Sequence, residues 1–172
     1  MLVALPAGLR APLQLVWLAG SPILTGLLAL LAAGRGRGRA WRVGAGFLGV
    51  VTVEALLKAL LPTPSPPLQP VTWPWLREWL GFLSPSPAHV GLALFRGTFP
   101  SGHVARITFA GWLLASGGGR RPGRGDRAAA WLAFLGALAV VATGGHWLWD
   151  ALGGALLGWS LARWTGGGGG GA

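Results

Sequence analysis

The sequence predicts an all-α fold, a polytopic membrane helix bundle with about five transmembrane helices and a short interfacial helix. Three observations carry this prediction. Of the 172 residues, 52% are hydrophobic and only 10% are charged, whereas soluble domains carry about 25% charged residues. Apolar runs long enough to cross a bilayer recur along the chain. Many of the eleven tryptophans lie near the ends of these runs, as interface anchors do.

The first half of the chain predicts two spans and an interfacial segment. The spans are Ala11–Ala33 and Val43–Leu61, separated by an arginine-rich loop. Residues 62–74 hold six prolines and therefore predict an extended loop outside the hydrocarbon. Apolar residues at helical spacing within 75–83 predict a short helix that lies in the membrane interface.

The second half predicts three more spans, Gly102–Ser116, Ala128–Thr143 and Trp147–Trp164, because backbone groups in lipid must be paired within helices. We expect a single membrane-embedded domain over residues 1–165. The remaining residues, 166–172, are nearly all glycine and predict a disordered tail.

Charge placement predicts the orientation. The arginine-rich loops after spans one and three, together with Arg163, hold nine of the fourteen Lys and Arg residues. Such loops face the cytoplasm, so we expect the N-terminus outside and the C-terminus inside, in a cell membrane such as the bacterial inner membrane. The net charge of +10 is then a topology signal, and no nucleic-acid partner is expected. The chain has no cysteine, which excludes disulfides and thiolate chemistry.

Two of the three histidines fall at the predicted outer face. His103 is at the start of span three, and His146 is at the start of span five. Asp150 follows His146 by one helical turn, so it can orient the imidazole and leave one ring nitrogen as a nucleophile or base. A purely structural His–Asp pair has about even odds for an isolated HxxxD pattern, although charges within a span are costly and favour function.

His103 ends the sequence Pro-Ser-Gly-His at 100–103, where Ser101, Gly102 and the free N–H groups of a helix start can bind an anion. A plain helix cap is the alternative, and for this motif alone it is favoured two to one, by our rough judgement. Arg106 and Arg96 lie near enough in sequence to bind phosphate oxygens. The alternative is that these two side chains reach to the membrane interface without binding phosphate, and this alternative fits Arg96 better than Arg106.

Cations from the second span complete the predicted site. Lys58 lies near the outer end of this span and can reach a phosphate, while Glu54 can pair with Lys58 or with Arg106. Two histidines, one aspartate and these cations suit phosphoryl transfer through a phosphohistidine, in which one histidine attacks phosphorus and the other protonates the leaving oxygen. The chain has too few carboxylates for a two-metal site, so we expect neither a metal nor a cofactor.

These motifs resemble those of the type 2 phosphatidic acid phosphatases, whose order is KxxxxxxRP, PSGH and SRxxxxxHxxxD. Here Lys58, the PSGH sequence and the His146/Asp150 pair occur in that order over roughly residues 50–160. The resemblance implies that His146 is the nucleophile, oriented by Asp150, and that His103 is the general acid. It also implies that Ser101 and Gly102 bind phosphate and that Lys58 is the first-motif lysine.

The chain departs from this pattern at two arginines. Ser65 stands at the first-motif arginine, and Ala139-Val140 stands at the SR of the third motif. The number of spans is also one below the family's usual six. Related lipid phosphotransferases keep the histidines and aspartate with less strict arginines. The sequence therefore predicts a phosphatase for a lipid phosphate, of the phosphatidate or polyprenyl diphosphate type. It leaves open a lipid headgroup phosphotransferase or a non-catalytic member that binds membrane lipid.

Overall fold

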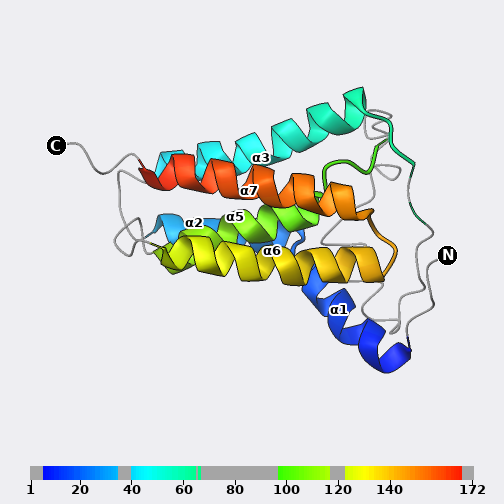
Figure 1. Cartoon of the computed structure of the whole chain (residues 1–172). Helices are drawn as coiled ribbons and strands as arrows, with labels where there is room; N and C mark the ends of the chain where they lie inside the picture. The colour runs from blue at the N-terminus through cyan, green and yellow to red at the C-terminus, as the bar shows by residue number, and fades with distance from the viewer. Residues whose placement is uncertain (1–5, 35–39, 65, 67–96, 117–122, 168–172) are drawn as a thin grey trace.

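The computed structural model, shown in Figure 1, describes residues 6–34, 40–64, 66, 97–116 and 123–167, and it is helical with no strand within these ranges. The predicted interfacial helix at 75–83 lies outside the described residues. The described helices are α1 (Ala7–Ala19), α2 (Pro22–Ala33), α3 (Ala40–Leu60), α5 (Gly102–Ser116), α6 (Arg124–Ala142) and α7 (Leu148–Gly167).

The chain is an all-α membrane protein, but the predicted count of five spans is not reached by the described helices. Two helices, α3 and α6, are long and apolar enough to cross a membrane, and the bent pair α1 and α2 makes a third if it counts as one span. Helix α5 has 15 residues, which gives a length of about 22 Å against a hydrocarbon core of roughly 30 Å.

The first predicted span is not one straight helix. Instead of a continuous Ala11–Ala33, the chain forms α1 and α2 with a bend of 54° between them. The break falls at Gly20 and Ser21, where the backbone of Ser21 is extended, and Pro22 then opens α2. Proline has no N–H to continue the first helix and is favoured at the first position of a new one. Hydropathy alone does not report such a break.

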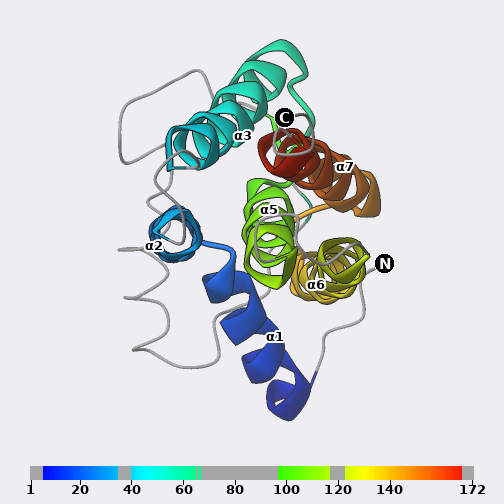
Figure 2. The same cartoon turned by 90° about the vertical axis from the view of Figure 1, so that its left-hand side faces the viewer.

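Helix α5 lies at the centre of the bundle, with the other helices arranged around it (Figure 2). Twelve of its fifteen residues are buried, although its sequence is no more apolar than that of its neighbours. The core cluster around Phe109 and Leu113 joins α5 to α2, α3 and α7. Large exposed side chains such as Leu48, Trp131 and Leu156 lie on the outer helices, as expected where lipid replaces water.

Helices α5 and α7 approach each other closely because glycines on α7 face the α5 backbone. A methyl group added at Gly154 would lie 2.3 Å from the carbonyl oxygen of Ser101, and one added at Gly158 would lie 2.1 Å from that of Ala105. This spacing is the small-xxx-small pattern of tightly packed membrane helices. It holds the start of α5 against the first half of α7.

Four helix termini therefore gather at one end of the bundle, on the right in Figure 1. The end of α3, the start of α5, the end of α6 and the start of α7 lie there. At the other end, α7 continues through Gly167, and residues 168–172 of the predicted tail lie outside the described residues.

We expect Gly158→Ala to destabilise the bundle, because the new methyl group would overlap the backbone of Ala105. Overpacking of this kind costs about 1–3 kcal/mol. Thermal unfolding in detergent measures the effect. The matched control is Gly44→Ala on α3, where an added methyl group meets nothing within 4 Å. Equal melting temperatures for the two variants would contradict the close α5–α7 contact.

Candidate active site

His146 lies in a tight turn between α6 and α7. Helix α6 ends in a Schellman motif, in which Gly144 adopts a left-handed φ of 74°. The N–H of Gly144 donates to the carbonyl of Val141 (3.1 Å), and the N–H of Gly145 donates to that of Val140 (2.7 Å). The N–H of His146 also donates to the Val140 carbonyl, at 3.0 Å. The turn thus fixes the histidine backbone at the end of the bundle where the helix termini gather.

Asp150 faces His146 from the first turn of α7. Its Oδ2 lies 3.4 Å from Nδ1 of His146 and accepts the backbone N–H of Trp147 at 3.0 Å. Reaching back to the N–H at the helix start, the aspartate acts as one half of a capping box. His146 and Asp150 are 9% and 3% exposed, so the pair is shielded on most sides.

The Pro-Ser-Gly-His segment is joined to both neighbouring helices. The N–H of Ser101 donates to the backbone carbonyl of Asp150 at 2.8 Å. Just before the motif, the N–H groups of Thr98 and Phe99 donate to Oγ1 of Thr63 at 2.9 and 3.1 Å. Thr63 follows α3, so these bonds hold the ends of α3, α5 and α7 in one arrangement.

A buried carboxylate links two cations beneath the motif. Glu54 on α3 is 7% exposed, and its two oxygens pair with different helices. Oε1 accepts from Lys58 Nζ at 2.6 Å, and Oε2 accepts from Arg106 Nη1 at 2.5 Å. Both pairings expected for Glu54 are thus confirmed, and they occur together. The carboxylate also fills the space where a side chain at Gly102 would stand, with its atoms 2.0–2.2 Å from an added Cβ.

His103 begins α5 above this ion-pair network. His103 lies within electrostatic range of Arg106, His146 and Lys58, and Glu54 lies within that of His146. The two histidines and the cations therefore form one electrostatic cluster. Cations, helix N–H groups and imidazoles are groups that can bind an anion such as phosphate.

Seven of the eight site residues expected from sequence are described and gather at this end of the bundle. They are Lys58, Ser101, Gly102, His103, Arg106, His146 and Asp150. The guanidinium of Arg106 points inward, with Nε donating to the carbonyl of Gly20 at 3.2 Å and Nη1 engaged by Glu54. Arg96 lies outside the described residues.

Sequence reasoning missed the contribution of α1. Trp17 packs edge-to-face on the His103 ring, with centroids 5.5 Å apart. Gly20 lies so close to the His103 backbone that an added Cβ would be 2.7 Å from its carbonyl oxygen. No local pattern signals either contact, because they depend on the bend between α1 and α2.

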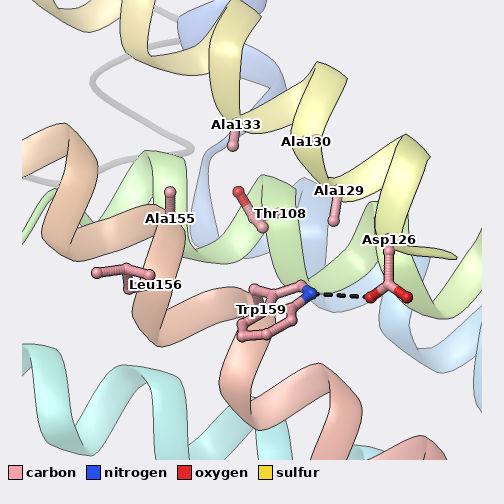
Figure 3. Close-up of a pocket in the computed structure, with 8 residues that line it drawn as sticks. All are labelled: Thr108, Asp126, Ala129, Ala130, Ala133, Ala155, Leu156 and Trp159. Carbon is pink, nitrogen blue, oxygen red and sulfur yellow. Dashed lines mark hydrogen bonds between the residues drawn. The ribbon is translucent and has the colours of Figure 1, made fainter. Parts of the chain in front are cut away.

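A cavity of about 300 Å³ lies elsewhere, between α5, α6 and α7 (Figure 3). Alanines of α6 and α7, Leu156 and Trp159 line it, and the indole of Trp159 donates to Asp126 at 2.8 Å. Asp126 is in the first turn of α6, whereas His146 follows the end of that helix, about 28 Å along its axis. The cavity therefore extends from the end opposite the histidines to the middle of the bundle.

The comparison with known families settles the membership of the chain. A sequence model of the PAP2 superfamily matches residues 39–166. The chain belongs to the PAP2 superfamily. The match contains α3, α5, α6 and α7 and leaves α1 and α2 outside it. No curated protein and no solved structure matched the chain.

Membership confirms the resemblance seen in the motifs and indicates phosphatase or phosphotransferase activity, which PAP2 proteins generally have. One departure from the PAP2 pattern is visible in the structure. Val140, at the third-motif arginine position, lies on α6 and is fully buried in a cluster with Val104 and Ala151. Within the described residues, no three His, Asp or Glu side chains group into a metal site, and metal independence stays a prediction.

We expect Glu54→Gln to destabilise the protein strongly, because Lys58 and Arg106 would lose their shared counter-charge. Breaking a buried ion pair from one side costs about 3–5 kcal/mol. Denaturation in detergent measures this loss. Asp126→Asn is the control. The side chain of Asp126 is 41% exposed, and its ion pair with Arg163 spans 3.8 Å, which makes the pair worth at most about 1 kcal/mol. The amide oxygen of asparagine can still accept the indole N–H groups of Trp112 and Trp159. Similar losses in both variants would contradict the role given to Glu54.

Proposed function

We propose that the protein is a lipid-phosphate phosphatase that acts through a phosphohistidine on His146, on a phosphatidate or polyprenyl diphosphate type of substrate. The observation that carries the proposal is the placement of two histidines, one in the turn between α6 and α7 and one at the start of α5. His146, backed by Asp150, and His103 lie in one electrostatic cluster with Lys58. Membership of the PAP2 superfamily supports the same chemistry.

The first half-reaction forms the phosphoenzyme. Asp150 accepts a hydrogen bond from Nδ1–H of His146, which keeps the proton on that nitrogen and leaves the Nε2 lone pair to attack phosphorus. As the N–P bond forms, the bond from phosphorus to the lipid oxygen breaks. His103 gives its proton to that oxygen, so the lipid leaves as an alcohol or, from a diphosphate, as a monophosphate.

The second half-reaction returns the enzyme to its starting state. His103, now neutral, takes a proton from a water molecule as the water oxygen attacks phosphorus. The N–P bond breaks, its electron pair returns to His146, and inorganic phosphate leaves. Lys58 and the N–H groups at the start of α5 stabilise the phosphoryl oxygens in both steps.

We further propose that this site faces outward from a cell membrane such as the bacterial inner membrane, with the C-terminus in the cytoplasm. Four described arginines support this orientation, because they lie toward the opposite ends of their helices from the histidines. They are Arg42, Arg124, Arg127 and Arg163. Basic residues concentrate on the cytoplasmic side of membrane proteins.

Transfer to a second lipid alcohol is the other candidate, favoured by the buried Val140 at the third-motif arginine position. In that reaction a lipid hydroxyl replaces water in the second step. The product would carry the phosphate headgroup, and little free phosphate would appear.

We expect purified protein to release phosphate from lipid phosphates in EDTA, and His146→Ala to abolish the release. His103→Ala should lower the rate roughly 10²–10⁴-fold, the usual contribution of a general acid. A colorimetric phosphate assay over a panel of monophosphates and diphosphates gives the readout. His89→Ala, at the histidine outside both motifs, is the matched control.

Release that survives in His146→Ala would overturn the proposed nucleophile. If wild type releases no phosphate but converts a mixture of two lipids into a new headgroup-bearing lipid, the transferase reading replaces the hydrolase. Lipid binding that persists in His146→Ala without either reaction would identify a non-catalytic member.

A further inference from the structure

The helix α1 lies outside the family-matched segment and yet reaches the candidate site. Its C-terminal turn carries Trp17, whose indole packs on the ring of His103 with an interplanar angle of 65°. The bend of 54° before α2 sets the direction of α1. In Figure 2, one end of α1 lies next to α5 and α6, and the other end points away from the bundle.

Trp17 lies beside both elements that carry a histidine. On one side its ring meets His103 at the start of α5. On the other side its ring atoms Cζ2 and Cε2 would lie 3.5 and 3.8 Å from a Cβ added at Gly145, the residue before His146. The indole thus fills the space between the start of α5 and the α6–α7 turn.

The backbone at the end of α1 reinforces this placement. The carbonyl of Gly20 accepts Nε of Arg106 at 3.2 Å, and Gly20 lies against the backbone of His103. Arg106 is in turn fixed by Glu54. The α1 terminus is therefore anchored to α5 by a charged hydrogen bond one turn beyond the histidine that it covers.

We propose that Trp17 is a positioning residue, which holds the imidazole of His103 in the orientation for proton transfer and shields one side of it from water. This role rests on the proposed function of His103 as general acid. An edge-to-face aromatic pair has a preferred geometry, and an imidazole free to rotate would present its proton to the leaving oxygen only part of the time. The element that supplies this restraint lies outside the part of the chain shared with the family model.

The kinetic test compares three variants with wild type. In Trp17→Leu, which removes the ring, kcat should fall roughly tenfold while KM changes less than about twofold. Trp17→Phe keeps a ring and should retain most of kcat. The matched control is Trp131→Leu, which removes another edge-to-face pair, that of Trp131 with Phe134 on the exposed side of α6. It should leave both constants unchanged.

A chemical test does not depend on activity. Diethyl pyrocarbonate modifies accessible imidazoles, and mass spectrometry of the peptides gives the rate at each histidine. His103 should react several-fold faster in Trp17→Leu than in wild type, Trp17→Phe or Trp131→Leu. If Trp17→Leu does not fold, Trp17→Met takes its place, because the longer and more flexible methionine side chain can fill part of the space of the indole without a ring.

Two results would overturn the proposal. One is a His103 modification rate that is the same in Trp17→Leu and in the control. The other is a Trp17→Phe enzyme whose kcat falls as far as that of Trp17→Leu, which would show that the ring contact is not the cause. Because the modification rates are measured without turnover, an inactive wild type would count against the proposed function and leave the Trp17 contact separately testable.

Discussion

A guanidinium buried inside a membrane bundle needs a counter-charge beside it, because lipid offers neither water nor counter-ions. Arg106 lies on the central helix α5 and is 6% exposed. Glu54 on α3 supplies the charge and at the same time holds Lys58, so one carboxylate joins a cation deep in the bundle to one nearer the site. The position of α5 relative to α3, and hence the position of the Pro-Ser-Gly-His segment, depends on this network.

The glycines of the site are explained by close packing around α5. Gly102 has no side chain because the Glu54 carboxylate occupies that space, and Gly154 and Gly158 have none because α7 lies against the α5 backbone. A glycine in a phosphate-binding motif is commonly explained by the approach of a ligand. In this protein the internal carboxylate gives a sufficient reason for Gly102, and the anion-binding role of the helix start is additional to it.

Some features of the fold and the site could be predicted from the sequence alone, and others could not. The bounds of α5 were predicted as they stand, since Pro100 and the glycines that follow Ser116 delimit an apolar run. The facing of His146 and Asp150 followed from their spacing in the sequence. By contrast, hydropathy alone did not reveal the bend at Gly20 and Ser21, although Gly20-Ser21-Pro22 interrupts the apolar run with residues that favour a break.

The contacts of α1 could not be derived from the sequence, because they depend on the direction of α1 after the bend. Trp17 and His103 are far apart in the chain, and only the direction of α1 after the bend brings them together. The sequence predicts that Glu54 pairs with Lys58 or with Arg106, whereas in the folded chain it pairs with both. Tertiary packing decides such pairings, and no local spacing encodes them.

The proposed chemistry depends most on the identity of the nucleophile, and one measurement tests that identity directly. Purified protein is mixed with lipid phosphate that carries a phosphorus label, quenched within the first turnover, and the labelled peptide is sequenced by mass spectrometry. The account predicts label on a ring nitrogen of His146, stable in alkali and lost in acid, and absent from His146→Ala. Label on a serine, an aspartate or His103 would contradict it.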